Sequence, residues 1–219
     1  MIENPENDPF EQSTQEIREL NQAEQDLLNK NSQSKLTDFK KNKLEIDAKR
    51  HWDIFYKNNG ARFFKDRNWL ERELGKVIDT EKEYSVLEVG CGVGNTVFPL
   101  LDVMKNMTVS ATDFSPRAVD LVKKRAVDEN YGDRMNLAFV SDLSKENAFP
   151  EEALQKYDFC TAIFVLSALS PPTFSTAIKN IKSCFSESSE QKILFFRDYA
   201  VNDHAMLRFK KGKCINTSF

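Results

Sequence analysis

The strongest constraint on the fold is a glycine-rich run, Leu87-Glu88-Val89-Gly90-Cys91-Gly92-Val93-Gly94-Asn95. It follows the short apolar stretch 84–89 and precedes residues 96–104, whose apolar side chains suit a helix. Glycine lets a backbone approach a ligand that side chains would exclude, and a helix N-terminus supplies free N–H groups. A strand that turns through such glycines into a helix is typical of a parallel α/β sheet.

Alternating strands and helices continue along the chain. Apolar runs predict strands at 84–89, 108–112, 136–140, 157–166 and 192–197. Between them, amphipathic runs predict helices at 96–104, 116–129 and 170–185. Ser115 and Pro116 fit the N-cap and first turn of the second of these helices. We therefore predict an α/β fold with a doubly wound, mainly parallel, Rossmann-like sheet.

A helical layer is expected before the sheet. Apolar residues at helical spacing predict one amphipathic helix over 36–56, ended by Asn58-Asn59-Gly60, and a shorter helix over 69–78. Residues 1–34 are acidic and rich in Asn, Gln and Ser, which indicates a disordered tail. We predict three regions: this acidic tail at 1–34, a helical layer at 35–80, and an α/β core at 81–219.

Glycines and acids fall at the ends of three successive predicted strands. Gly90 opens the turn after the first, Asp113 ends the second, and Asp142-Leu143 follow the third. A carboxylate at Asp113 can accept both hydroxyls of a ribose, which suits NAD and S-adenosylmethionine alike. A dinucleotide pattern, however, requires glycine where this chain has Asn95.

The GxGxG spacing preceded by an acid, here Glu88, is the pattern of S-adenosylmethionine enzymes, where the acid lies near the positively charged methionine end of the cofactor. In such proteins a carboxylate at the third strand holds the adenine amino group and an apolar side chain holds its ring. Asp142 and Leu143 match these positions, although Asp142 taken alone is a turn residue. The three positions together predict a class I S-adenosylmethionine-dependent methyltransferase.

Three further positions have two interpretations each. Ile163, near the end of the fourth strand, would form the floor under the cofactor or be an ordinary buried strand residue. Trp52 and Tyr56 share one helix face, so they either pack in the core or cover the cofactor as an aromatic lid over its sulfonium. Arg197 and Asp198 end the fifth strand and face the ligand crevice, or else form a structural ion pair.

Composition limits the alternatives. The net charge of −3 argues against a protein that coats nucleic acid by bulk electrostatics, although residues 35–72 carry a basic excess that suits phosphate or a solvated helix face equally. The four cysteines form no CxxC pair, so we expect no metal site and a reducing compartment, the cytoplasm or also the nucleus. No signal peptide and no apolar run near the roughly 20 residues of a membrane span occur.

Several blocks together resemble a known family. They span residues 52–57, 63–67, 88–95, 113–118, 163–168, 196–199 and 203–209, and Phe63-Phe64-Lys65-Asp66-Arg67 is far more specific than the glycine run. This set resembles the eukaryotic tRNA N(3)-cytidine methyltransferases, which form 3-methylcytidine at position 32 of the anticodon loop of serine and threonine tRNAs. The similarity covers roughly residues 35–212.

The resemblance implies roles for individual residues. S-adenosylmethionine would contact a set of seven: Trp52, Tyr56, Gly90, Asp113, Asp142, Leu143 and Ile163. It favours the lid interpretation of Trp52 and Tyr56, and it implies that 35–80 is a helical lid and RNA-contact region and 81–219 the S-adenosylmethionine-binding core. Residues 63–67 and 197–199 would border the target base and its phosphates, with Asp198 and Arg197 as catalytic candidates.

The resemblance also implies partners, and one departure from the family. The substrate would be serine or threonine tRNA, with a tRNA synthetase as a candidate helper. Members of the family continue beyond the Arg208-Phe209-Lys210 block into an antiparallel hairpin, so we expect a core that lacks this hairpin. A methyltransferase acting on protein or a small molecule, and a catalytically impaired protein that only binds S-adenosylmethionine, are the alternatives.

Overall fold

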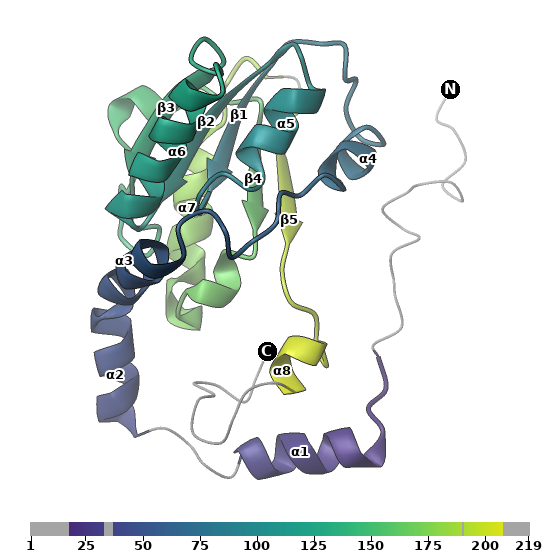
Figure 1. Ribbon diagram of the computed structural model, residues 1–219, viewed down its shortest axis with the longest axis vertical. Coiled ribbons are helices and arrows are strands. Elements are labelled where there is room, and N and C mark those ends of the chain that lie inside the picture. Colours follow the sequence, from purple (N-terminus) through teal and green to yellow (C-terminus); the bar gives the residue numbers. More distant parts are fainter. Residues whose placement is uncertain (1–17, 33–36, 190, 208–219) are drawn as a thin grey trace. The chain divides into compact units, whose positions relative to one another are not determined.

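A computed structural model describes residues 18–32, 37–189 and 191–207 (Figure 1). The chain divides into two compact units, and the larger, Ile46–Asp198, contains every cofactor-contact and catalytic residue proposed above, whereas Tyr199 belongs to the smaller unit. The smaller unit includes α1 (Gln22–Ser32), most of α2 (Asp38–Ile46) and α8 (His204–Leu207). Residues 22–32 are thus helical where the sequence predicted disorder, whereas residues 1–17 and 33–34 of the predicted tail lie outside the described residues.

The sheet of the larger unit is entirely parallel. Its strands are β1 (Tyr84–Val89), β2 (Met107–Asp113), β3 (Met135–Val140), β4 (Phe159–Ile163) and β5 (Ile193–Arg197). They lie in the order β3-β2-β1-β4-β5, so the strand order reverses between β1 and β4. Open α/β sheets bind ligands outside the carboxyl ends of the strands at such a reversal. The predicted fold class is confirmed.

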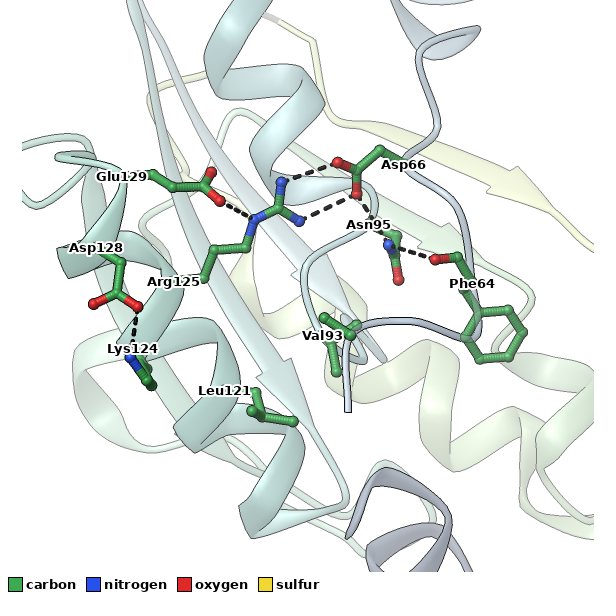
Figure 2. Close-up of a pocket in the computed structure, with 10 residues that line it drawn as sticks. Phe64, Asp66, Val93, Asn95, Leu121, Lys124, Arg125, Asp128 and Glu129 are labelled. Carbon is green, nitrogen blue, oxygen red and sulfur yellow. Dashed lines mark hydrogen bonds and ion pairs between the residues drawn. The ribbon is translucent and has the colours of Figure 1, made fainter. Parts of the chain in front are cut away.

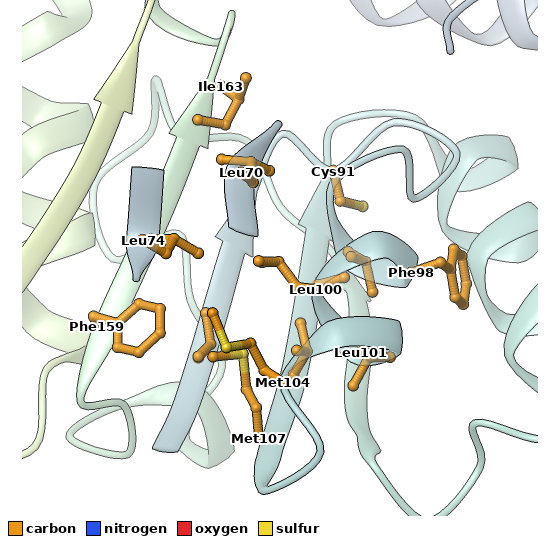
Figure 3. Packing of buried hydrophobic residues seen from close by; sticks show 14 of the residues in the cluster. Leu70, Leu74, Cys91, Phe98, Leu100, Leu101, Met104, Met107, Phe159 and Ile163 are labelled. Carbon is orange, nitrogen blue, oxygen red and sulfur yellow. The ribbon is translucent and has the colours of Figure 1, made fainter. Parts of the chain in front are cut away.

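Helices cover both faces of the sheet. α4 (Leu70–Leu74), α5 (Val97–Val103) and α6 (Pro116–Asp128) contribute to the core cluster on one face, and α7 (Phe174–Cys184) packs on the other. Figure 3 shows the first cluster, in which Leu74 of α4 lies near Phe159 of β4 and Leu70 of α4 lies near Ile163. Three short 3-10 turns complete this unit, at Glu151–Ala153, Leu166–Ala168 and Pro171–Thr173. Among the described residues, none of the helices has both the length and the apolar character that a bilayer span requires.

Two helix predictions need correction. The single helix expected over 36–56 is interrupted at Asp47, and its second part is α3 (Ala48–Asn59), which ends at Gly60. No glycine or proline stands at Asp47, so the sequence pattern runs through the break without a signal. The helix expected over 69–78 is only the short α4, because the chain leaves the helix at Gly75.

Candidate functional site

The glycine bend after β1 has the conformation that its glycines suggested. Gly90, Gly92 and Gly94 have φ values of 63°, 55° and 88°, a region that other residues rarely adopt. A Cβ at position 90 would lie 2.6 Å from a methyl carbon of Val165, and one at position 94 would lie 2.2 Å from the Phe98 ring. The bend therefore depends on glycine both for its backbone angles and for close packing.

Asp113, at the tip of β2, is hydrogen-bonded to the bend. Its Oδ2 accepts from the Gly92 N–H at 2.8 Å, and its Oδ1 accepts from the Ser115 N–H at 2.8 Å. The carboxyl is 8% exposed, and burial raises its pKa above the usual range. A carboxylate has about four lone-pair sites, so both oxygens retain capacity to accept from a ligand hydroxyl.

Backbone hydrogen bonds hold the three strand tips together. Cys91 N–H donates to the Thr112 carbonyl at 2.9 Å, and Ser141 N–H donates to the Asp113 carbonyl at 3.0 Å. The glycine bend, Asp113 and the Asp142 turn are consequently neighbours at one edge of the sheet. This is the convergence that the spacing of these residues predicted.

Asp142 takes part in a turn in the structure. Its Oδ1 accepts from Ser144 N–H at 3.0 Å and from Ser144 Oγ at 2.5 Å. Leu143 is 6% exposed and belongs to the core on the α7 face. The buried Asn180 side chain donates to the Leu143 carbonyl at 3.1 Å and thereby fixes this loop. Asp142 is therefore held in one orientation beside Asp113.

Helix α3 brings Trp52 and Tyr56 to the glycine bend. Their rings stack with centroids 5.9 Å apart, and Tyr56 is only 6% exposed. Tyr56 packs with Val93 of the bend and with Ala118 of α6, and a Cβ on Gly92 would lie 2.9 Å from the Tyr56 hydroxyl. Burial raises the pKa of Tyr56 well above its usual range. The two aromatic rings thus lie over the bend, and Tyr56 packs in a small core there.

One side chain of α3 fastens the helix to α6. Asp53 accepts from the Ser115 hydroxyl at 2.8 Å and from the Arg117 N–H at 3.2 Å. Ser115 is the N-cap of α6 and lies two residues from Asp113. A carboxylate at a helix N-terminus is favourably placed against the helix dipole. Asp53 therefore sets the distance between the aromatic rings of α3 and the tip of β2.

Glu88 is buried inside the sheet just before the bend. It is 1% exposed and pairs in register with Ala111 and Thr161 on the neighbouring strands. Burial raises its pKa to about 8, against the smaller opposite effects of a hydrogen bond with Thr96 and the charge of Arg67. Its Oε2 has no hydrogen-bond partner among the described residues. An acid of this kind is stabilised by any positive charge that approaches the bend.

The remaining predicted residues lie at the ends of β4 and β5. Ile163 is 5% exposed and packs with Leu70 and Cys91 in the core seen in Figure 3. The Arg197 guanidinium lies over the Trp69 ring, 4.2 Å from its centroid. Asp198 Oδ2 accepts from the Ser167 N–H at 2.9 Å and so anchors the loop after β4.

A cavity of about 480 Å³ lies between the glycine bend, the segment that contains Phe64 and Asp66, and helix α6 (Figure 2). Its lining includes Phe64, Asp66, Asn95 and Arg125, but not Asp113 or Asp142. Asn95 Nδ2 donates to the Phe64 carbonyl at 3.2 Å and to Asp66 Oδ1 at 3.0 Å. From the sequence, Asn95 was noted only as a departure from the dinucleotide pattern. No sequence feature predicted that Arg125 would line a cavity. Within the described residues, no group of three His, Cys, Asp or Glu side chains is arranged to hold a metal ion.

Comparisons with known proteins identify the family of the chain. A family model described as a methyltransferase domain matches residues 87–188. The chain is 38% identical to the mouse tRNA N(3)-cytidine methyltransferase METTL6 over 215 residues, which cover 96% of this chain and 73% of that protein. It is 41% identical to the tRNA N(3)-methylcytidine methyltransferase trm141 of Schizosaccharomyces pombe, covering 80% and 69%. It is also 35% identical to the tRNA(Thr) (cytosine(32)-N(3))-methyltransferase of Saccharomyces cerevisiae, covering 83% and 29%.

Proposed function

This chain belongs to the family of tRNA N(3)-cytidine methyltransferases. From that membership we propose that it methylates N3 of cytidine 32 in the anticodon loop of serine tRNA, threonine tRNA or both. It is an S-adenosylmethionine-dependent methyltransferase. One relative carries threonine tRNA and cytosine 32 in its name. The observation that carries the methyltransferase part is the set of hydrogen bonds that join the glycine bend, Asp113 and Ser141, the residue before Asp142. The tRNA part is supported by the relatives' names.

The residues at this edge fit S-adenosylmethionine. Gly90, Gly92 and Gly94 have positive φ values and carry no side chain, so the backbone of the bend can approach a ligand closely. Asp113, held by the Gly92 N–H, would accept from the ribose hydroxyls, and Asp142, held by the Ser144 N–H, would accept from the adenine amino group. The buried carboxyl of Glu88 suits the positively charged end of the molecule. When bound, S-adenosylmethionine supplies an electrophilic methyl group on its sulfonium.

The role of the protein in the reaction is mainly to position the reactants. Cytosine N3 has a lone pair at neutral pH, so no general base is needed for its attack on a methyl group. Alignment of reacting groups can lower a barrier by up to about 7–11 kcal/mol. Trp52 and Tyr56 on α3 exclude water from the bend, which strengthens the electrostatic interactions within it.

Asp198 is the candidate for stabilising the product charge. Methylation at N3 makes the base cationic, and a carboxylate beside it would stabilise that charge as it develops. The Ser167 N–H holds Asp198 Oδ2 at 2.9 Å, which fixes the orientation of the carboxylate. Because N3 lies on the pairing edge, the target base must be unpaired, as bases of an anticodon loop are.

Nucleoside mass spectrometry tests the proposal directly. The purified protein is incubated with S-adenosylmethionine and unmodified serine or threonine tRNA, and 3-methylcytidine is measured. A transcript with uridine at position 32 is the control and should yield no 3-methylcytidine. Methylation of that control, or of a protein extract in place of tRNA, would contradict the proposed target.

A substitution tests the assigned carboxylate. Asp198→Asn retains an oxygen that can accept from the Ser167 N–H but removes the charge. We expect turnover to fall by about 100-fold with S-adenosylmethionine affinity unchanged, by analogy with the loss of one stabilising group in other active sites. Unchanged turnover on tRNA would show that Asp198 does not stabilise the product cation.

A further inference from the structure

Asn95 joins the glycine bend to the segment Phe64–Arg67. Its side chain is 7% exposed and donates to the Phe64 carbonyl and to Asp66 Oδ1. Its own carbonyl accepts from the Arg67 N–H at 2.8 Å. Three hydrogen bonds therefore connect the last residue of the bend to three residues, Phe64, Asp66 and Arg67, about 30 positions away in the sequence.

Arg125 of α6 holds the same segment from the other side. Its two terminal nitrogens bind Asp66 Oδ1 at 3.1 Å and Oδ2 at 2.9 Å, and its Nε binds Glu129 at 2.9 Å (Figure 2). The hydrogen bonds from Arg125 hold the pKa of the Asp66 carboxyl below its usual range. A bidentate guanidinium–carboxylate pair has a fixed geometry, unlike the single ion pairs of most protein surfaces.

Arg125 also contacts the glycine bend through the Phe98 ring. The Arg125 guanidinium lies 4.3 Å from the centroid of the Phe98 ring, and that ring occupies the space beside Gly94 that a Cβ would need. These contacts form a closed ring. Gly94 contacts Phe98, Phe98 contacts Arg125, Arg125 binds Asp66, and Asp66 binds Asn95, which is the residue after Gly94. The bend and the segment are therefore in contact by two routes, one through Asn95 and one through Phe98 and Arg125.

The segment held in this way carries exposed aromatic rings. Phe63 is 59% exposed and Phe64 is 38% exposed, and both contact the ring of Phe55 on α3. Arg62 and Lys65 on either side of them are exposed. Exposed aromatic rings between basic side chains suit the unpaired bases and phosphates of a single-stranded RNA loop.

We propose that Asn95, Asp66 and Arg125 are positioning residues that couple cofactor binding at the glycine bend to the order of residues 61–67, and through them to binding of the RNA loop. This inference rests on the proposed function for its RNA partner. Coupling between two sites is reciprocal, so cofactor and RNA must raise each other's affinity by the same factor. Typical coupling factors are about 5- to 150-fold.

Hydrogen exchange tests the first half of the proposal without RNA. Amide exchange of residues 61–67 is measured with and without S-adenosylhomocysteine in the natural protein, in Asp66→Ala and in Lys124→Ala. Lys124 is the matched control, because it lies on the same helix as Arg125 and, within the part of the chain that the structure describes, it pairs with Asp128 and not with Asp66. We expect the ligand to slow exchange in the natural protein and in Lys124→Ala, and to leave it unchanged in Asp66→Ala. Equal slowing in all three proteins would overturn the coupling.

RNA binding tests the second half. The affinity for an unmodified anticodon-stem-loop RNA is measured with and without saturating S-adenosylhomocysteine. We expect the ligand to raise RNA affinity about fivefold or more in the natural protein and by less than about twofold in Asp66→Ala. In the absence of RNA, Asp66→Ala should bind S-adenosylhomocysteine more weakly than the natural protein, by no more than about fivefold because coupling is reciprocal, and its melting temperature should stay close to the natural value. A purely structural role would instead lower that affinity and the melting temperature together.

The two tests separate the inference from the proposed function. If ligand slows exchange at residues 61–67 but no tRNA is methylated, the proposed function fails and the positioning network stands. If tRNA is methylated but Asp66→Ala has the natural kcat/KM and the natural coupling factor, the network is not a positioning device. Should Asp66→Ala fail to fold, Asp66→Asn carries the same test, because it keeps an acceptor for Asn95 and loses the charge that Arg125 binds.

Discussion

Replacing Glu88 by glutamine should stabilise the protein, and the stabilisation should grow as the pH rises. Glu88 is 1% exposed, and its Oε2 has no hydrogen-bond partner among the described residues. Burial raises its pKa from the ordinary 4.5 to about 8. Glutamine has nearly the same shape, keeps an oxygen for the contact with Thr96, and has no proton to release.

The magnitude follows from the two pKa values. Below the ordinary pKa both the folded and the unfolded protein bind the proton, so Glu88 has no effect on the pH dependence. Between 4.5 and about 8 the unfolded state loses the proton and the folded state keeps it, so stability falls as the pH rises. Each unit of pKa difference corresponds to about 1.4 kcal/mol, which gives a loss of about 1 kcal/mol at pH 5 and about 3 kcal/mol at pH 7.

Urea denaturation without cofactor at these two pH values measures the effect. The difference in free energy of unfolding between Glu88→Gln and the natural protein should increase by about 2 kcal/mol from pH 5 to pH 7. Glu152→Gln, at an exposed position, controls for the loss of one negative charge. A Glu88→Gln difference that is the same at both pH values would refute the reasoning, because it would mean that Glu88 titrates alike in the folded and unfolded states.

Three further substitutions test the site. Gly94→Ala should lower the free energy of unfolding by about 3 kcal/mol in a urea titration, because position 94 has a positive φ and an added Cβ would lie 2.2 Å from Phe98. Gly132→Ala is the control. It should change that free energy by less than about 1 kcal/mol, since no atom lies within 4 Å of the added carbon. Asp53→Ala should weaken S-adenosylhomocysteine binding about fivefold in calorimetry by freeing α3, and an unchanged affinity would show that Asp53 does not hold the lid. Asp113→Asn should weaken the same binding by about 10- to 100-fold, because a charged acceptor for the ribose is lost; a loss below threefold would argue against that role.

The strand tips were predictable from sequence because the relevant information is local. Gly90, Asp113 and Asp142 each stand where a short apolar run ends, and parallel strands bring such ends to one edge. The structure confirms that they are neighbours through the Cys91–Thr112 and Ser141–Asp113 backbone bonds. Their contacts with cofactor remain predictions.

The interactions that join distant segments were not predictable in this way. Asp66 and Arg125 are far apart in the sequence, and each is an ordinary charged residue in its own neighbourhood. The break at Asp47 was missed for a related reason, since the apolar spacing continues across it and no glycine or proline marks it. The periodicity of apolar residues predicts which side chains share one face of a helix or strand. It does not predict which residues of other segments pack against that face.

The close packing of Phe98 against Gly94 restricts which substitutions can be accepted at these two positions during evolution. A larger residue at position 94 is tolerated only where position 98 has already become smaller, and a smaller residue at 98 removes the ring on which Arg125 rests. Lineages that lose one member of this set are therefore expected to lose the others, and their histories should show substitutions at 94, 98 and 125 arriving together.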